Sequence, residues 1–177
     1  MPGLADADAV RRFLREFGRL ARQPATVYLV GGGTAVLEGW RQTTIDIDLR
    51  IEPEDDDILR RLPELKIRLG INVELASPLD FLPEPTGWRD ASPFVSQEGP
   101  LTVRHMDPAL QALAKLERGF DQDLEDVAAM LERGLVDPAR LQRLSDEIEP
   151  LLFRFPAVDV ERLRGAVHSV VRGGSSD

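Results

Sequence analysis

Asp46 and Asp48 are the side chains of this sequence whose spacing most clearly points to chemistry. They stand in an alternating segment, residues 44–51, in which the apolar side chains, beginning with Ile45, take one face of a predicted strand and the two aspartates take the other. Adjacent carboxylates repel each other, and Mg²⁺ relieves that repulsion because it accepts one or two protein carboxylates beside water and phosphate oxygens. The pair therefore predicts a Mg²⁺ or Mn²⁺ site, although alone it is equally typical of the wet face of an edge strand.

A glycine cluster, residues 31–33, lies between the apolar run 27–30 and a short segment of helix formers. Glycines allow a close backbone approach, and amides at the start of a helix can face an anion. Gly32, Gly33 and Thr34 are therefore candidate phosphate-binding residues. The alternative is a tight strand-to-helix turn without a ligand, since the cluster matches neither the P-loop pattern nor the dinucleotide fingerprint.

Glu74 supplies a third candidate carboxylate. It stands in a short alternating segment, residues 71–75, whose apolar members Ile71, Val73 and Leu75 share one face. If this strand lies beside that of the two aspartates with its apolar face toward the same core, Glu74 projects on their side. Asp80, in the loop that follows, is the alternative third carboxylate.

The order of these features resembles a known signature. Gly32-Gly33, a short helix and then Asp-x-Asp on a strand are similar to the nucleotidyltransferase superfamily, the polymerase-β-like fold. The segments 73–78, 115–119 and 123–127 further resemble small prokaryotic members related to abortive-infection toxins of the AbiE type. The resemblance covers roughly residues 25–133.

This resemblance implies that the chain transfers a nucleoside monophosphate from an NTP to an acceptor hydroxyl. Asp46 and Asp48 would hold the metal ions, and Glu74 would be a metal ligand or the base, although many superfamily members have aspartate at that position. Lys115 and Arg118, three residues apart on one predicted helix face, would lie near the triphosphate. Without the resemblance, surface salt bridges are the better interpretation of those two side chains.

The resemblance also bears on partners and on alternatives. The acceptor could be a tRNA or a protein, and the chain could be the toxin-like component of a toxin-antitoxin or phage-defence system with a cognate antitoxin. The principal alternative is a catalytically silent domain of the same fold that binds or regulates another protein. A metal-dependent phosphohydrolase is disfavoured because His105 and His168 are isolated, which also indicates structural or exposed roles for both.

Composition narrows the class of protein. The 177 residues are 42% hydrophobic and carry 22 Lys and Arg against 31 Asp and Glu, a net charge of −9. Such an acidic surface disfavours strong non-specific binding to nucleic acid. The chain has no cysteine, no signal-peptide pattern and no apolar run long enough for a bilayer, so a soluble cytoplasmic protein without membrane association is expected.

Periodicity and turn residues predict strands in the first part of the chain and helices after about residue 107. The resemblance implies that they form an α+β nucleotidyltransferase fold, with a small twisted mixed sheet flanked by helices and a C-terminal helical region. We expect a nucleotidyltransferase core over residues 1–105, a helical region over 106–172 and a disordered tail over 173–177. Helices are expected over 8–22, 107–118, 121–132, from 137 and over 156–171, with a hairpin over 93–103. Residues 77–93, rich in proline, are predicted to be a long loop.

Overall fold

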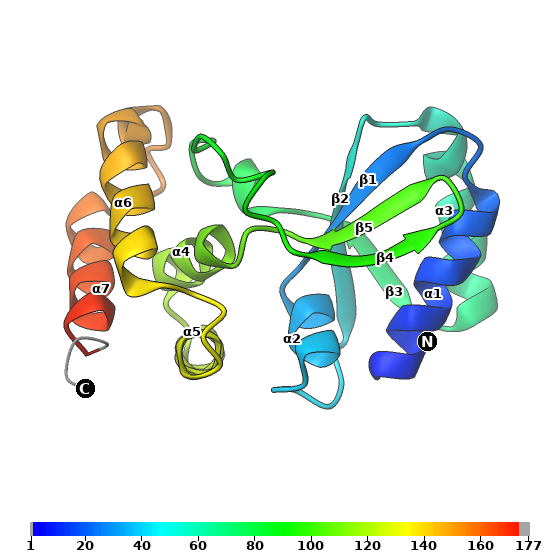
Figure 1. Cartoon of the computed structure of the whole chain (residues 1–177), viewed down its shortest axis with the longest axis horizontal. Coiled ribbons are helices and arrows are strands. Elements are labelled where there is room, and N and C mark those ends of the chain that lie inside the picture. The colour runs from blue at the N-terminus through cyan, green and yellow to red at the C-terminus, as the bar shows by residue number, and fades with distance from the viewer. Residues whose placement is uncertain (1, 174–177) are drawn as a thin grey trace. The chain divides into compact units, whose positions relative to one another are not determined.

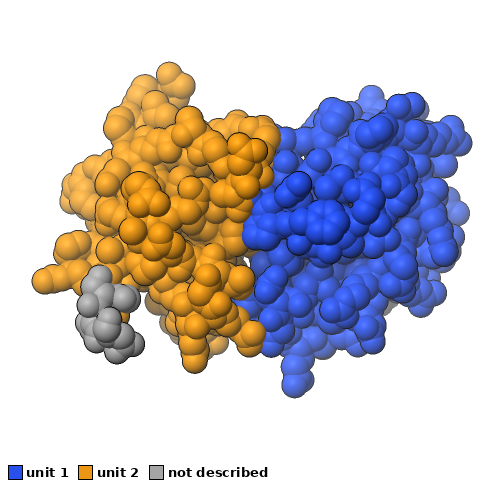
Figure 2. Space-filling model, viewed as in Figure 1, with its two compact units in different colours: residues 1–77, 92–106 blue, residues 78–91, 107–177 orange. Residues whose placement is uncertain are grey.

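The computed structural model describes residues 2–173, and these residues form two compact units. Of the described residues, the first unit combines those up to 77 with 92–106, and the second combines 78–91 with those from 107 onward (Figure 2). This division differs from the one expected from sequence chiefly at residues 78–91, which group with the helical unit.

The first unit is built on a five-stranded sheet in the order β3-β2-β1-β5-β4 (Figure 1). The strands are β1 (Ala25–Val30), β2 (Asp46–Glu52), β3 (Asn72–Leu75), β4 (Phe94–Glu98) and β5 (Leu101–His105). Strand β1 runs antiparallel to β2 and parallel to β5, while β2 and β3 are parallel and β4 and β5 form an antiparallel hairpin. The predicted mixed sheet and the predicted hairpin are therefore confirmed.

Three helices of the first unit pack on one face of this sheet: α1 (Ala7–Leu20), α2 (Gly32–Glu38) and α3 (Asp56–Leu69). Their apolar side chains, among them Phe13 and Ile58, join Leu29 and Ile47 of the strands in one buried cluster. The acidic segment before α3 caps this helix, because the Asp55 side chain accepts a hydrogen bond from the backbone of Asp57. Burial of this apolar face leaves the other face of the sheet to polar side chains.

Strand β2 shows the predicted alternation with one correction. Ile47 and Leu49 are fully buried, while Asp46 and Asp48 are only partly buried on the opposite face. Ile45 was expected to share the buried face, but this residue is 69% exposed. The reason is that pairing with β3 begins at Asp46, so Ile45 precedes the ladder and the alternation does not extend to it.

The second unit is helical. Its elements are η1 (Pro78–Asp80), α4 (Pro108–Arg118), α5 (Asp121–Glu132), α6 (Pro138–Ile148), η2 (Glu149–Arg154) and α7 (Val160–Gly173). Asp107 and Asp137 cap α4 and α6 ahead of proline, and Gly119 ends α4 in the left-handed conformation. Both helices therefore begin within a residue of the positions expected from the sequence.

Helix α7 begins at Val160 rather than at residue 156, and the carboxylate of Asp159 accepts a hydrogen bond from the backbone of Arg162. Its last residue is Gly173, and the remainder of the predicted tail, residues 174–177, lies outside the described residues. Within residues 2–173, every helix is too short or too polar to span a bilayer.

Candidate active site

The polar face of the sheet brings together the three carboxylates singled out in the sequence. Asp48 and Glu74 are direct register partners in the parallel strands β2 and β3, and Asp46 pairs in the same way with Asn72. Partners in adjacent strands project to the same side of a sheet, and so do residues two apart along one strand. Glu74 therefore lies on the face of Asp46 and Asp48, as the alternation predicted.

Asn72 connects two of these carboxylates. Its Nδ2 donates to Asp46 Oδ1 at 2.6 Å and to Glu74 Oε1 at 3.1 Å. A side-chain amide carries two hydrogens on that nitrogen, so one Asn72 can satisfy both acceptors and hold them at a fixed separation. Sequence reasoning did not select Asn72 as a site residue, although its position two residues before Glu74 on the same strand face was the available signal.

The glycine turn packs against β2 beside the aspartates. Gly31 has a φ of 59°, and a Cβ placed on it would lie 3.4 Å from Asp48 Oδ2. A Cβ on Gly32 would overlap the Thr44 hydroxyl and lie 3.3 Å from the carbonyl oxygen of Asp46. The absence of side chains at residues 31 and 32 is thus what allows the turn to approach the strand that carries both carboxylates.

Residues 9–169 match the model of the family described as "Nucleotidyltransferase of unknown function (DUF6036)". The chain belongs to this family. No curated protein and no solved structure matches it. Together with the helix-flanked mixed sheet, membership confirms the predicted nucleotidyltransferase fold. The narrower resemblance to AbiE-type toxins stays a prediction, because the family description does not mention them.

Thr34 is buried, and its hydroxyl makes its contacts inside the first unit. Thr34 Oγ1 lies 3.0 Å from His105 Nδ1 and 3.3 Å from the carbonyl oxygen of Leu29. His105 is the register partner of Leu29, so both face the helices rather than the carboxylates. The structure therefore brings Gly31 and Gly32 to the aspartates but directs the Thr34 hydroxyl to the opposite side of the sheet.

His105 has a structural role, one of the two alternatives inferred from the sequence. Its Nε2 lies 3.0 Å from Glu38 Oε1, at the end of α2, and its Nδ1 contacts Thr34 of the same helix. The imidazole therefore links β5 to two positions of α2. Burial lowers the pKa of His105 below its ordinary value, and the Glu38 carboxylate opposes that shift. Since burial is the larger effect, the neutral imidazole is favoured in the folded protein, with one ring nitrogen donating and the other accepting.

The two predicted triphosphate cations belong to the second unit and form ion pairs there. Lys115 Nζ lies 2.8 Å from Asp126 Oδ2, and the two side chains are only 6% and 2% exposed. Arg118 lies 2.6 Å from Asp123 Oδ1 and is half exposed. Both cations thus form ion pairs, as the alternative interpretation expected, although the Lys115 pair is buried rather than on the surface. A role in binding phosphate stays a prediction for both side chains. Asp80 belongs to the same unit, in η1.

The oxygen donors of the polar face fit a magnesium ion held by few protein ligands. Asp46 and Asp48 offer hard carboxylate oxygens from one rigid strand, and Mg²⁺ needs only one or two of these. Within residues 2–173, no group of three or more histidine or acidic side chains is placed to hold a metal ion. The arrangement therefore fits a site formed by the aspartate pair, with Glu74 linked to Asp46 by hydrogen bonds through Asn72.

Proposed function

We propose that this chain transfers a nucleoside monophosphate from an NTP to an acceptor hydroxyl and releases pyrophosphate. The observation that carries the proposal is the register of β2 and β3, which sets Glu74 opposite Asp48 on the strand face that also carries Asp46. The close approach of Gly31 to Asp48 adds a glycine turn at the same edge. Membership in a nucleotidyltransferase family supports this reaction class.

Each group has a distinct role in the proposal. Mg²⁺ or Mn²⁺, when bound by Asp46 and Asp48, would neutralise the triphosphate and polarise the transferred phosphoryl group. The backbone amides of the glycine turn would face the phosphate oxygens. Glu74 would accept the proton of the attacking hydroxyl at a carboxylate oxygen, and Asn72 would hold that carboxylate in place through the 3.1 Å hydrogen bond to Oε1.

The acceptor and the partner are the finer parts of the proposal. By the AbiE-type resemblance, the acceptor is a tRNA or a protein in the cytoplasm, and the chain is a toxin-like component restrained by an antitoxin. The net charge of −9 means that a tRNA acceptor would require a local basic surface rather than a generally basic protein.

A catalytically silent domain of the same fold is the second candidate, and one observation favours it. Lys115, the lysine expected near the triphosphate, is buried against Asp126. A domain of this kind would bind its partner without nucleotide. Labelling of an acceptor that requires Mg²⁺ and NTP therefore distinguishes the enzyme from the silent domain.

The deciding experiment incubates the protein with labelled NTPs, Mg²⁺ and cell extract, then separates RNA from protein. Label in either fraction identifies the acceptor class, and the Asp46→Asn, Asp48→Asn double variant should abolish it. The variant Asp8→Asn, Asp56→Asn removes the same charge from exposed helix positions and should keep activity. Absence of labelling, together with absence of a Mg²⁺-dependent rise in melting temperature with NTP, would leave the silent domain as the answer.

Glu74 and Asp80 are distinguished in the same assay. Glu74→Gln keeps size and hydrogen bonding but removes the base, so transfer should fall by about 10²-fold or more while NTP affinity changes far less. Asp80→Asn should transfer at the parental rate. The reverse pattern would assign the third carboxylate to Asp80.

A further inference from the structure

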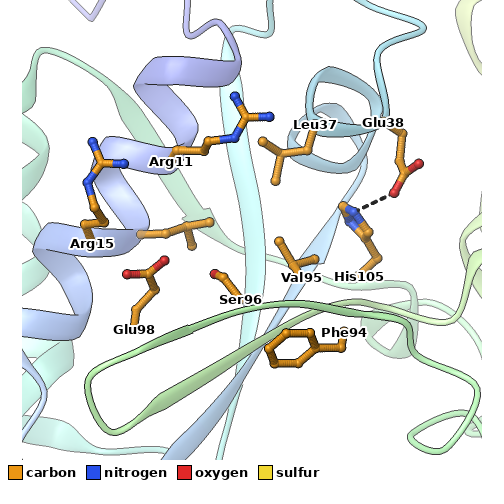
Figure 3. Close-up of a pocket in the computed structure, with 10 residues that line it drawn as sticks. Arg11, Arg15, Leu37, Glu38, Phe94, Val95, Ser96, Glu98 and His105 are labelled. Carbon is orange, nitrogen blue, oxygen red and sulfur yellow. Dashed lines mark ion pairs between the residues drawn. The ribbon is translucent and has the colours of Figure 1, made fainter.

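The first unit contains a pocket of about 330 Å³ on the helix-covered side of the sheet. Its walls come from α1, the end of α2, strand β4 and His105 of β5 (Figure 3). His105 lies on the sheet face that carries the buried Leu101 and Val103, whereas Asp48 lies on the other face. The pocket is therefore separated from the carboxylates by the sheet itself.

One side of this pocket carries two cations. Arg11 and Arg15 are four residues apart on α1 and so occupy the same helix face. Arg11 has only a 3.4 Å contact with the exposed carboxylate of Asp8. Arg15 makes no ion pair or hydrogen bond within the part of the chain that the structure describes, although Glu98 also lines the pocket. Two guanidinium groups on one helix face can donate hydrogen bonds to a single oxyanion.

The rest of the pocket is largely apolar. Figure 3 shows Leu37 of α2 and Val95 of β4 between the arginines and the His105–Glu38 pair. Phe94, also in the wall, is 59% exposed. The volume lies at the lower end of the ~300–1,000 Å³ common for ligand pockets, so it suits a small ligand rather than a nucleoside triphosphate.

We propose that this pocket binds a small organic anion, one with a carboxylate, sulfonate or phosphate headgroup on a short apolar body. The headgroup accepts hydrogen bonds from Arg11 and Arg15, and the body packs on Leu37 and Val95. The ligand also reaches the His105–Glu38 pair at the far wall. This pocket and its ligand are independent of the transfer reaction proposed for the opposite face.

The test is a fluorescence titration of the full chain with two probes that share one aromatic body. Anilinonaphthalene sulfonate carries the anionic headgroup, and phenylnaphthylamine lacks it. We expect saturable binding of the sulfonate, weakened about tenfold or more by Arg11→Gln, Arg15→Gln because charge-assisted hydrogen bonds are lost. The matched variant Arg12→Gln, Arg19→Gln removes the same charge from α1 outside the pocket and should change the affinity by less than about twofold.

The neutral probe locates the apolar part of the site. Its affinity should be the same in the parent and in both arginine variants, while Ser96→Phe should weaken both probes because it fills the pocket from β4. The Asp46→Asn, Asp48→Asn variant should bind the sulfonate as the parent does. No saturable sulfonate binding, equal losses in the two arginine variants, or a loss on changing the aspartates would each overturn the proposal.

Discussion

Replacing Gly32 with alanine should destabilise the junction between the glycine turn and β2. The new Cβ would overlap the Thr44 hydroxyl and lie 2.7 Å from Thr44 Cβ, whereas carbon atoms in contact prefer about 3.5–4.0 Å. Rotation of the hydroxyl cannot relieve the second clash, because the Thr44 backbone is held by two hydrogen bonds to Ala5, of 2.8 and 2.9 Å. Backbone movement is therefore required, and overpacking of this kind costs about 1–3 kcal/mol.

The assay is thermal unfolding, in which each kcal/mol lowers the melting temperature by about 2–4 °C for a chain of this length. Gly33→Ala is the matched control, because its Cβ would lie 3.7 Å from Ile47 and Leu29, an ordinary contact, and alanine favours the helix. Its stability should equal or exceed that of the parent. Thr44→Gly removes both clashes, so Gly32→Ala should cost less in that background. Equal melting temperatures for the Gly32 and Gly33 variants would refute the close approach.

Two further outcomes follow from the buried charges. Asp126→Asn leaves the Lys115 ammonium buried without its carboxylate partner at 2.8 Å, so the free energy of unfolding should fall by about 3–5 kcal/mol. The control Asp8→Asn changes an exposed ion pair and should have little effect. Equal losses of the two variants in denaturant titrations would contradict the burial of the Lys115–Asp126 pair. His105 has a lowered pKa in the folded state, so the unfolded chain binds the proton first and the free energy of unfolding should fall as the pH drops below about 6.5. In His105→Gln, the free energy of unfolding should lack this fall between neutral and mildly acidic pH. If the variant keeps the parental pH dependence, the effect belongs to another group.

Much of the polar face could be predicted because it depends on local rules. Alternation along a strand fixes which side chains share a face, and this placed Asp46 and Asp48 together. Glu74 joined them on the assumption that the two strands are neighbours, which the pairing of β2 with β3 bears out. Likewise, proline after aspartate and a terminal glycine predicted the bounds of α4 within a residue. The exposure of Ile45 was missed because strand ends are set by the pairing partner, which the local pattern does not contain.

The remaining features depend on contacts between distant residues. Lysine on a helix is normally exposed, and only the packing of α5 against α4 shows that Lys115 is buried with Asp126 as its partner. Similarly, no spacing rule connects His105 to Thr34, which are 71 residues apart. Local patterns of periodicity and charge could not predict the Lys115–Asp126 pair or the His105–Thr34 pair. Such patterns identify the face on which a side chain lies, but not the residue that packs against it.

The first unit consists of two separate chain segments, and this affects both its folding during synthesis and the separation of the two units by cleavage. The chain leaves the sheet after β3, contributes residues 78–91 to the second unit, and then returns to add β4 and β5. During translation, one edge of β1 lacks its partner until residues 101–105 emerge, and an unpaired strand edge can pair with another chain. No single cleavage yields both units whole, since a cut after residue 106 still leaves residues 78–91 attached to the sheet. An isolated sheet unit would need a short linker in place of that excursion, and an isolated helical unit would lack η1.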